Sequence, residues 1–279
     1  MQAYGNTRKV RVAAAEIGGG GRLALIAGPC VIESESHTRR MAEALVRLAG
    51  DLRIPFIFKS SYDKANRSSA GGFRGPGIGE GLRILGAVKG EFDVPVLSDV
   101  HCREDIAQAA ETLDIIQIPA FLCRQTDFLV AAARSGRPVN IKKGQFMAPW
   151  DMKNAADKVA GAGNQDIVIT ERGASFGYNN LVADMRALPI MRGFGWPVVF
   201  DATHSVQLPG GKGSCSGGDR DMAAVLARSA VAAGVDGVFL EVHDNPDAAP
   251  CDGPNMIPLE ELGRLLETLL AVDSAVRGK

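Results

Sequence analysis

The stretch LALIAGPC, residues 23–30, is a short apolar run that ends on the reactive side chain of Cys30. Seven further apolar runs end in the same way on polar or charged residues: PFIFK at Lys59, VPVLSD at Asp99, IIQ at Gln117, VNIKK at Lys142 and Lys143, IVITER at Glu171 and Arg172, VVFDATH at His204, and VFLEVH at Glu241 and His243. Segments long enough for a helix separate these runs. Strands that are apolar almost throughout are typical of parallel sheets covered on both faces. The alternation predicts an α/β fold, a (β/α)8 TIM barrel whose active site lies where the strands end.

The chain length suits one such barrel. The 279 residues are close to the roughly 250 of a typical (β/α)8 domain, so we expect a single domain over residues 1–279. The segment RKVRVAAAEIGGGGR, residues 8–22, predicts a β-hairpin that closes the barrel bottom, with a flexible turn at residues 18–21. Helical patterns predict outer helices at residues 34–52, 107–113, 129–133, 152–159, 182–191, 222–233 and 259–276. Long loops at residues 60–81, 205–221 and 244–256 are expected to form binding walls or lids.

Composition and charge argue against several classes of partner. Lys and Arg number 31 and Asp and Glu number 32, so a net charge of −1 favours neither nucleic acid nor a membrane surface. We find no apolar run near the ~18 residues of a membrane span, and no apolar stretch follows the first basic residues, as a secretory signal would require. The five cysteines form no CxxC pair. An odd number at irregular spacing favours a reducing, cytoplasmic location over a disulfide framework.

Six cations lie at predicted strand ends or in the rim loops: Lys59, Lys64, Arg67, Lys142, Lys143 and Arg172. A closed barrel brings the strand ends within reach of one another, and several cations in one cleft repel unless an anion neutralises them. The group therefore predicts a phosphorylated or carboxylated substrate. The alternative is that these residues are solvated charges of the rim.

A second group has the side chains of a metal site. Cys30, His204 and Glu241 belong to the first, seventh and eighth strand regions, which are neighbours in a barrel, and Asp252 lies in the last loop. Sulfur, nitrogen and oxygen donors together favour Zn, Fe(II), Mn or Co over Mg. Each residue also has a simpler interpretation, with Cys30 in the core, His204 in a hydrogen bond and Glu241 in an ion pair.

Three other polar residues have open or minor roles. Asp99 either hydrogen-bonds a sugar hydroxyl or caps the following helix. His37, on the first predicted helix, is expected at the surface. His243 either orients Glu241 or is exposed.

The sequence resembles the 3-deoxy-D-manno-octulosonate 8-phosphate synthase family from about Leu23 to the last helix. The resemblance rests on the motifs IAGPCVIES, FKSSYDKANRSS, FRGPG, LSDVH, QIPAFLCRQTD, NIKKGQF, ERGASFGYNN, FDATHSVQ and EVHDNPDAAPCDGP. The wider group includes 3-deoxy-D-arabino-heptulosonate 7-phosphate synthases and sialic-acid synthases. The segment KANRSS distinguishes the octulosonate enzymes, because the heptulosonate enzymes carry a KPRT-type segment there.

The resemblance implies a transferase that condenses phosphoenolpyruvate with D-arabinose 5-phosphate and releases inorganic phosphate, in lipopolysaccharide biosynthesis. It assigns phosphoenolpyruvate to Lys59, Ser61, Lys64, Gln117, Lys142, Arg172 and His204, and arabinose phosphate to Asn66, Arg67, Ser68 and Asp99. It implies catalytic roles for Lys59, Lys142, Arg172, His204 and Asp252, and a homotetramer in which Arg124 reaches across a subunit boundary.

The resemblance also bears on the metal. Metal-free members carry Asn where Cys30 stands, so Cys30 places the chain in the metal-dependent branch, with His204, Glu241 and Asp252 as the other ligands of one divalent ion. Whether this ion orients the aldehyde or activates water stays open. The alternatives to the octulosonate enzyme are a heptulosonate synthase that takes erythrose 4-phosphate, and a non-catalytic barrel that binds phosphosugars.

Overall fold

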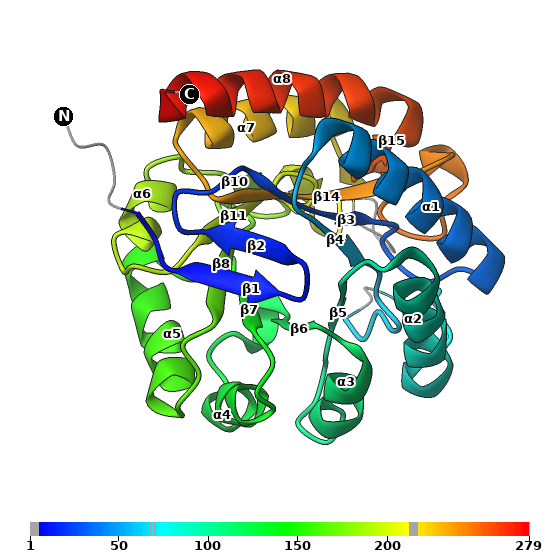
Figure 1. Cartoon of the computed structure of the whole chain (residues 1–279), viewed down its shortest axis with the longest axis horizontal. Coiled ribbons are helices and arrows are strands. Elements are labelled where there is room, and N and C mark those ends of the chain that lie inside the picture. Colours follow the sequence, from blue (N-terminus) through cyan, green and yellow to red (C-terminus); the bar gives the residue numbers. More distant parts are fainter. Residues whose placement is uncertain (1–5, 67–68, 70, 212–216, 279) are drawn as a thin grey trace.

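Eight parallel strands form a closed barrel in the computed structural model, which describes residues 6–66, 69, 71–211 and 217–278 (Figure 1). They are β3 (Ala24–Gly28), β4 (Phe56–Lys59), β5 (Val96–Asp99), β6 (Ile115–Ile118), β7 (Val139–Lys142), β8 (Ile167–Glu171), β11 (Val198–Asp201) and β14 (Gly237–His243). Each pairs with the next in chain order, and β14 pairs with β3 to close the ring. The predicted (β/α)8 barrel is therefore confirmed.

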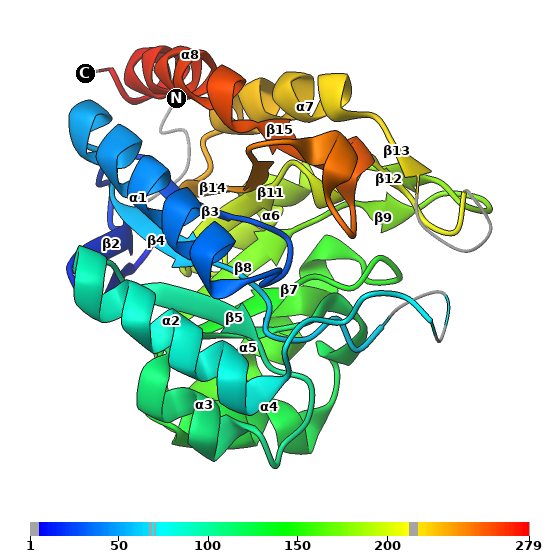
Figure 2. The same cartoon turned by 90° about the vertical axis from the view of Figure 1, so that its right-hand side faces the viewer.

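The helices surround the barrel on its outside (Figures 1 and 2). They are α1 (Glu35–Leu52), α2 (Ile78–Phe92), α3 (Ile106–Thr112), α4 (Thr126–Arg134), α5 (Met152–Gly161), α6 (Ala187–Arg192), α7 (Arg220–Ala232) and α8 (Leu259–Arg277). Short 3-10 turns occupy Ala120–Leu122, Pro149–Asp151, His204–Val206, Pro246–Ala248 and Gly253–Asn255. Among the described residues, no helix combines the length and apolarity that crossing a membrane requires.

The sequence analysis did not predict helix α2, and it placed the start of α6 wrongly. Helix α2 begins at Ile78, inside the segment that the sequence assigned to a loop, because its glycines hid the buried face formed by Leu82, Leu85 and Val88. Helix α6 begins five residues later than predicted, at Ala187 rather than residue 182. The reason is that residues 181 and 182 form β10 (Leu181–Val182), which pairs with β9 (Ala174–Ser175). A further two-stranded sheet pairs β12 (Gln207–Leu208) with β13 (Gly217–Gly218), and β15 (Ile257–Pro258) pairs with the last residues of β14.

The predicted N-terminal hairpin closes the end of the barrel where the strands begin (Figure 1). It consists of β1 (Lys9–Val12) and β2 (Ala15–Gly18). Its buried Val10, Val12 and Ile17 pack against the first interior residues of the barrel strands. The predicted turn was wrong: the chain reverses between β1 and β2, at Ala13, whose φ is 50°. The glycines serve a close approach instead, since a Cβ on Gly18 would lie 2.4 Å from the carbonyl oxygen of Arg8.

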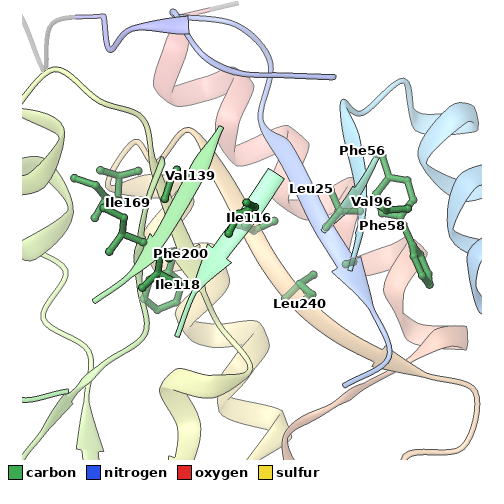
Figure 3. Packing of buried hydrophobic residues seen from close by; sticks show 14 of the residues in the cluster. Leu25, Phe56, Phe58, Val96, Ile116, Ile118, Val139, Ile169, Phe200 and Leu240 are labelled. Atoms are coloured by element: carbon green, nitrogen blue, oxygen red, sulfur yellow. The ribbon is translucent and has the colours of Figure 1, made fainter. Parts of the chain in front are cut away.

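The barrel strands alternate between two apolar layers, as the two-residue period of a β-strand requires. One set faces the helices and forms the large outer core, which includes Leu25, Phe58, Ile116, Phe200 and Leu240 (Figure 3). The other set fills the barrel interior beside the hairpin: Ala24, Ile26, Ile57, Leu97, Ile115, Val168, Val199 and Phe239. The positions that follow this interior layer along the strands form the floor of the site described next.

Candidate active site

A cleft of about 720 Å³ opens at the end of the barrel where the strands finish. Such a volume lies within the range of small-molecule sites. Loops after β4, β11 and β14 contribute to its walls, as expected for the long rim segments. Eight residues that the sequence singled out line the cleft: Lys64, Asn66, Asp99, Gln117, Lys142, Arg172, His204 and Asp252.

The floor of the cleft follows from strand alternation. On seven of the strands, the residue two positions after the apolar interior residue also points into the barrel. These residues are all buried: Gly28, Lys59, Asp99, Gln117, Thr170, Asp201 and Glu241. Residues in a strand share a face at every second position. The barrel interior therefore changes from apolar to polar in a single step toward the strand ends, and charged groups crowd into one layer.

Lys59 on β4 and Glu241 on β14 form a buried ion pair across the intervening strand β3. Lys59 Nζ donates to Glu241 Oε1 at 2.9 Å and to the carbonyl oxygen of Cys30 at 2.9 Å. Burial alone would raise the pKa of Glu241, but the charges of His204, Lys59 and Lys64 outweigh it and hold that pKa well below its usual range. Glu241 is therefore ionised in a site shielded from water.

Lys142, Asp201 and His204 form a second charged group. Lys142 Nζ donates to Asp201 Oδ2 at 2.5 Å and lies 3.9 Å from the centre of the Phe239 ring. Asp201 Oδ2 also lies 2.8 Å from His204 Nδ1, and Oδ1 accepts from the His204 backbone N–H at 2.9 Å. Burial lowers the pKa of Lys142, and the charge of Asp201 only partly opposes this shift. Lys142 therefore gives up a proton more readily than an ordinary lysine.

Arg172 presents an unsatisfied donor in the wall of the cleft. Its Nη2 donates to Gln207 Oε1 at 2.9 Å, whereas Nη1 is buried and has no hydrogen-bond partner among the described residues. Gln207 in turn donates to Asp252 Oδ1 at 3.0 Å, which ties the loop after β11 to the loop after β14. A buried donor without a partner is costly, so this guanidinium is suited to an anionic ligand.

Asp99 faces the opposite side of the cleft. Its Oδ1 accepts a 2.5 Å hydrogen bond from Ser61 Oγ, and its Oδ2 lies 3.5 Å from His101 Nε2. Burial alone would raise the pKa of Asp99, but the charges of Lys64, His101 and Lys59 hold it well below its usual range. The alternative role as a helix cap was wrong, because the N-cap of α3 is Asp105.

Three of the four predicted metal ligands converge. One ligand atom from each of Cys30, Glu241 and Asp252 lies within 4.8 Å of the other two. Cys30 Sγ donates to Asp252 Oδ2 at 3.3 Å, and Cys251, which the sequence did not single out, places its Sγ 3.0 Å from Cys30 Sγ. His204 Nε2 lies 3.5 Å from Glu241 Oε1 but does not belong to the three-residue group.

This donor set fits a divalent ion. Glu241 Oε2 is buried and has no hydrogen-bond partner among the described residues, so an oxygen ligand is available beside the thiol. Burial raises the pKa of the Cys30 thiol, and Cys251 and Glu241 raise it further. A bound cation has the opposite effect: it lowers the pKa of the thiol, because it stabilises the thiolate. Sulfur and carboxylate donors together suit a borderline transition-metal ion.

Several predicted residues lie outside this arrangement. Lys143 faces away from the barrel interior, where its Nζ donates to the carbonyl oxygens of Gly144, Met147 and Gly173. It therefore does not join the cations of the cleft. Arg124 is exposed and does not line the cleft. Arg67 and Ser68 lie outside the described residues.

Two histidines are also not where they were expected. His37 and His243 are both buried, at 6% and 4% exposure, and their rings lie 4.6 Å apart. His243 Nε2 contacts Glu33 Oε1 at 2.8 Å rather than Glu241. The surface position predicted for His37 was wrong because the loop after β14 covers the first turn of α1 through Asp244.

Sequence reasoning missed Asp201, although the run VVFDATH contains it. The sequence pattern could have identified it. Asp201 lies at a strand end, two positions after an inward-facing apolar residue, so it also faces the barrel interior and belongs to the polar layer. Gln207 and Cys251 had no comparable signal, since both lie in loops whose course depends on the whole fold.

The comparison with known proteins agrees with this architecture. The model of the DAHP synthetase I family matches residues 7–277. A 2-dehydro-3-deoxyphosphooctonate aldolase of Trichlorobacter lovleyi is 61% identical over 271 residues, which cover 97% of this chain and 100% of that protein. The protein of the same name from Geobacter metallireducens is 62% identical with the same coverage, and that of Geobacter sulfurreducens is 57% identical.

Proposed function

The chain belongs to the DAHP synthetase I family, and from this membership, its relatives and its cleft we propose that it is a 3-deoxy-D-manno-octulosonate 8-phosphate synthase. In this reaction phosphoenolpyruvate, D-arabinose 5-phosphate and water give 3-deoxy-D-manno-octulosonate 8-phosphate and inorganic phosphate. The product serves lipopolysaccharide biosynthesis. The relatives named 2-dehydro-3-deoxyphosphooctonate aldolase support this choice of substrates.

One observation carries the proposal: the cleft is lined by cations, one of them with an unsatisfied guanidinium nitrogen, and by Asp252, whose carboxylate lies beside the buried Cys30 and Glu241. Phosphoenolpyruvate brings a phosphate and a carboxylate. Lys64, Lys142 and Arg172 supply positive charge for both, with Arg172 Nη1 as a free donor. Charge-assisted hydrogen bonds of this kind are about twice as strong as neutral ones.

The sugar phosphate binds toward the loop after β4. Asn66 and Asp99 line this part of the cleft, and Asp99 is ionised and held by Ser61. An ionised carboxylate accepts hydrogen bonds from sugar hydroxyls. We assign Arg67 and Ser68 to the same subsite on the basis of their family motif.

The chemical step joins C3 of phosphoenolpyruvate to the aldehyde carbon of the sugar. Positive charge then develops at C2, where water adds before the bond to the phosphate oxygen breaks. The ionised Asp201 and Glu241 lie beneath the cleft, in contact with Lys142 and His204 that line it, and stabilise that charge. Lys142 is the group we assign to protonate the developing alkoxide, because burial lowers its pKa.

A divalent ion would be held by Cys30, Glu241 and Asp252, with His204 turning toward it from beside Glu241. When bound, such an ion acts as a Lewis acid toward an oxygen of the reactants. The family resemblance of Cys30 and the unsatisfied Glu241 Oε2 support this assignment. Asp201 lies against Nδ1 of His204 and keeps the ring oriented.

Phosphate release from purified protein tests the function. With phosphoenolpyruvate present, we expect release with arabinose 5-phosphate and little with erythrose 4-phosphate. Release that requires erythrose 4-phosphate would assign the chain to the heptulosonate enzymes. Binding of both substrates without release would make it a phosphosugar-binding protein and would overturn the proposal.

A further inference from the structure

A second group of potential metal ligands lies apart from the catalytic cleft. One ligand atom from each of Glu33, His37 and His243 lies within 4.8 Å of the other two. None of these three residues lines the cleft. Asp244 is adjacent, with Oδ1 placed 3.1 Å from both His37 Nε2 and His243 Nδ1.

We propose that Glu33, His37 and His243, with Asp244 beside them, form a second binding site for a divalent transition-metal ion such as Zn²⁺ or Co²⁺. Two imidazoles and two carboxylates are the donors that these ions prefer when no thiolate is present. The two carboxylates balance the charge of the ion, and Arg40, 3.5 Å from Asp244 Oδ2, offsets part of the remaining negative charge.

His37 adds a second observation. It is buried, and its Nδ1 has no hydrogen-bond partner among the described residues, while its Nε2 faces Asp244 Oδ1 at 3.1 Å. The hydrogen bonds of His243 are also suited to exchange for an ion. The backbone N–H of Asn245 donates to His243 Nδ1 at 2.9 Å, so the proton is on Nε2, which faces Glu33 Oε1 at 2.8 Å. An ion binds both Nε2 and Glu33 Oε1 once this proton has moved to Nδ1, which then gives up the hydrogen bond from Asn245 and donates to Asp244 Oδ1, 3.1 Å away.

The ion can reach the site without unfolding of the chain. The side chains of Glu33 and Asp244 are 24% and 40% exposed, whereas those of His37 and His243 are 8% and 5% exposed. The carboxylates therefore lie on the solvent side and the imidazoles on the protein side. Ligand atoms of a tetrahedral ion lie roughly 3.3 Å apart when the bonds are about 2.0 Å long. The present ligand atoms of Glu33, His37 and His243 lie within 4.8 Å of one another, so binding requires them to approach by up to about 1.5 Å.

The location of the site suggests what the ion does. Glu33 follows Cys30 by three residues, and His243 follows Glu241 by two on the strand that pairs with β3. An ion held between them connects the two segments that carry the thiol and the buried carboxylate of the cleft. The second ion is thus a positioning element, and its occupancy stabilises the start of α1 against the end of β14.

Titration of the metal-free, tag-free chain with Co²⁺ alone tests the site. We expect two equivalents per chain in the wild type: one with a thiolate-to-cobalt charge-transfer band, and one with ligand-field bands only. His37→Leu should lose only the second equivalent, and it should retain the thiolate band. Glu33→Gln should weaken the second equivalent by at least about tenfold.

The matched control is Glu35→Gln. Glu35 lies on the first turn of α1, as His37 does, but its carboxylate pairs with Arg83 and is not part of the cluster. It should leave both equivalents unchanged. A single equivalent in the wild type overturns the proposal, and so does a second equivalent that persists in both His37→Leu and Glu33→Gln. Because Glu33 is partly exposed, its variant remains informative even if His37→Leu does not fold. None of these measurements depends on turnover.

Discussion

At the scale of single residues, the neighbours Lys142 and Lys143 show how one position decides a role. Lys142 faces the barrel interior and pairs with Asp201 in the cleft. Lys143 faces outward and lies 3.4 Å from Glu171, where it holds backbone carbonyls of the surrounding loops. Successive residues of a strand point to opposite faces. Lys142 and Lys143 are therefore adjacent in sequence and carry the same charge, but only Lys142 can contact a ligand in the cleft.

The thiol of Cys30 is the residue on which the metal assignment depends most. Cys30→Asn replaces a soft ligand by a weak one, so we expect divalent-metal affinity to fall by more than the ~10–100-fold that loss of an outer-shell partner costs. Partial turnover should survive, because metal-free members of the resembling family carry Asn at this position. Elemental analysis after dialysis measures the metal.

The exposed Cys102 provides the control for that change, since Cys102→Asn should leave the metal content as in the wild type. Unchanged metal content in Cys30→Asn would show that Cys30 is not a ligand. Complete independence of the wild-type rate from metal, in protein stripped of it, would contradict a catalytic ion.

Asp99 predicts a pH dependence with a defined sign. Its pKa in the folded state lies below the usual value, so its ionised form stabilises the fold above the usual carboxyl pKa of about 3.9. This contribution is lost as the pH falls through the lower, folded-state pKa. Asp99→Asn should cost about 1–3 kcal/mol near neutral pH, and the difference from the wild type should shrink below about pH 4.

Urea unfolding at several pH values measures this difference. Glu111→Gln, which alters an exposed carboxylate on α3, should show a difference near zero at every pH. A cost of Asp99→Asn that stays constant down to strongly acidic pH would contradict the assigned ionisation.

At the scale of elements, the hairpin β1–β2 and the rim loops occupy opposite ends of one barrel. The hairpin supplies apolar side chains where the strands begin, and the polar layer starts where the strands end. In such barrels, residues at the end where the strands begin generally serve stability, and residues at the end where the strands finish form the active site.

The hairpin should therefore matter for stability and not for substrate binding. Ile17 has no exposed surface, so Ile17→Ala should lower the free energy of unfolding by about 2–5 kcal/mol. Arg11→Ala, on the exposed face of the same hairpin, should change it by less than about 0.5 kcal/mol. Urea unfolding measures both. A changed KM for phosphoenolpyruvate in folded Ile17→Ala would show that the two ends are coupled.

At the scale of the whole molecule, the rim carries more apolar surface than a small-molecule cleft requires. Phe121, Phe146, Trp150, Phe176 and Tyr178 follow β6, β7 and β8, and each is more than half exposed. Exposed aromatic groups of this kind mark interaction sites. They support the homotetramer that the family resemblance implies, in which Arg124 would reach a neighbouring subunit.

Light scattering coupled to size-exclusion chromatography tests the assembly. The wild type should have the mass of four chains, and Phe176→Glu should shift the mass toward smaller species, because a charge at a buried interface is costly. Val276→Glu, on the exposed face of α8, should not change the mass. A monomeric wild type at micromolar concentration would contradict the tetramer. The cytoplasmic location and the single domain over residues 1–279 stay predictions.

The sequence by itself determined the strands, most of the helices and the chemical types gathered at the strand ends. Apolar runs and helical periodicity are local, so they can be read without knowing which segments meet. Only the tertiary structure decided which polar residues share the cleft. It placed Cys30 beside Asp252, and Asp201 beside Lys142, across long separations in sequence. It also turned Lys143 outward and buried His37 with His243. These outcomes depend on barrel closure and strand register, because each contact joins segments whose relative position no local pattern specifies.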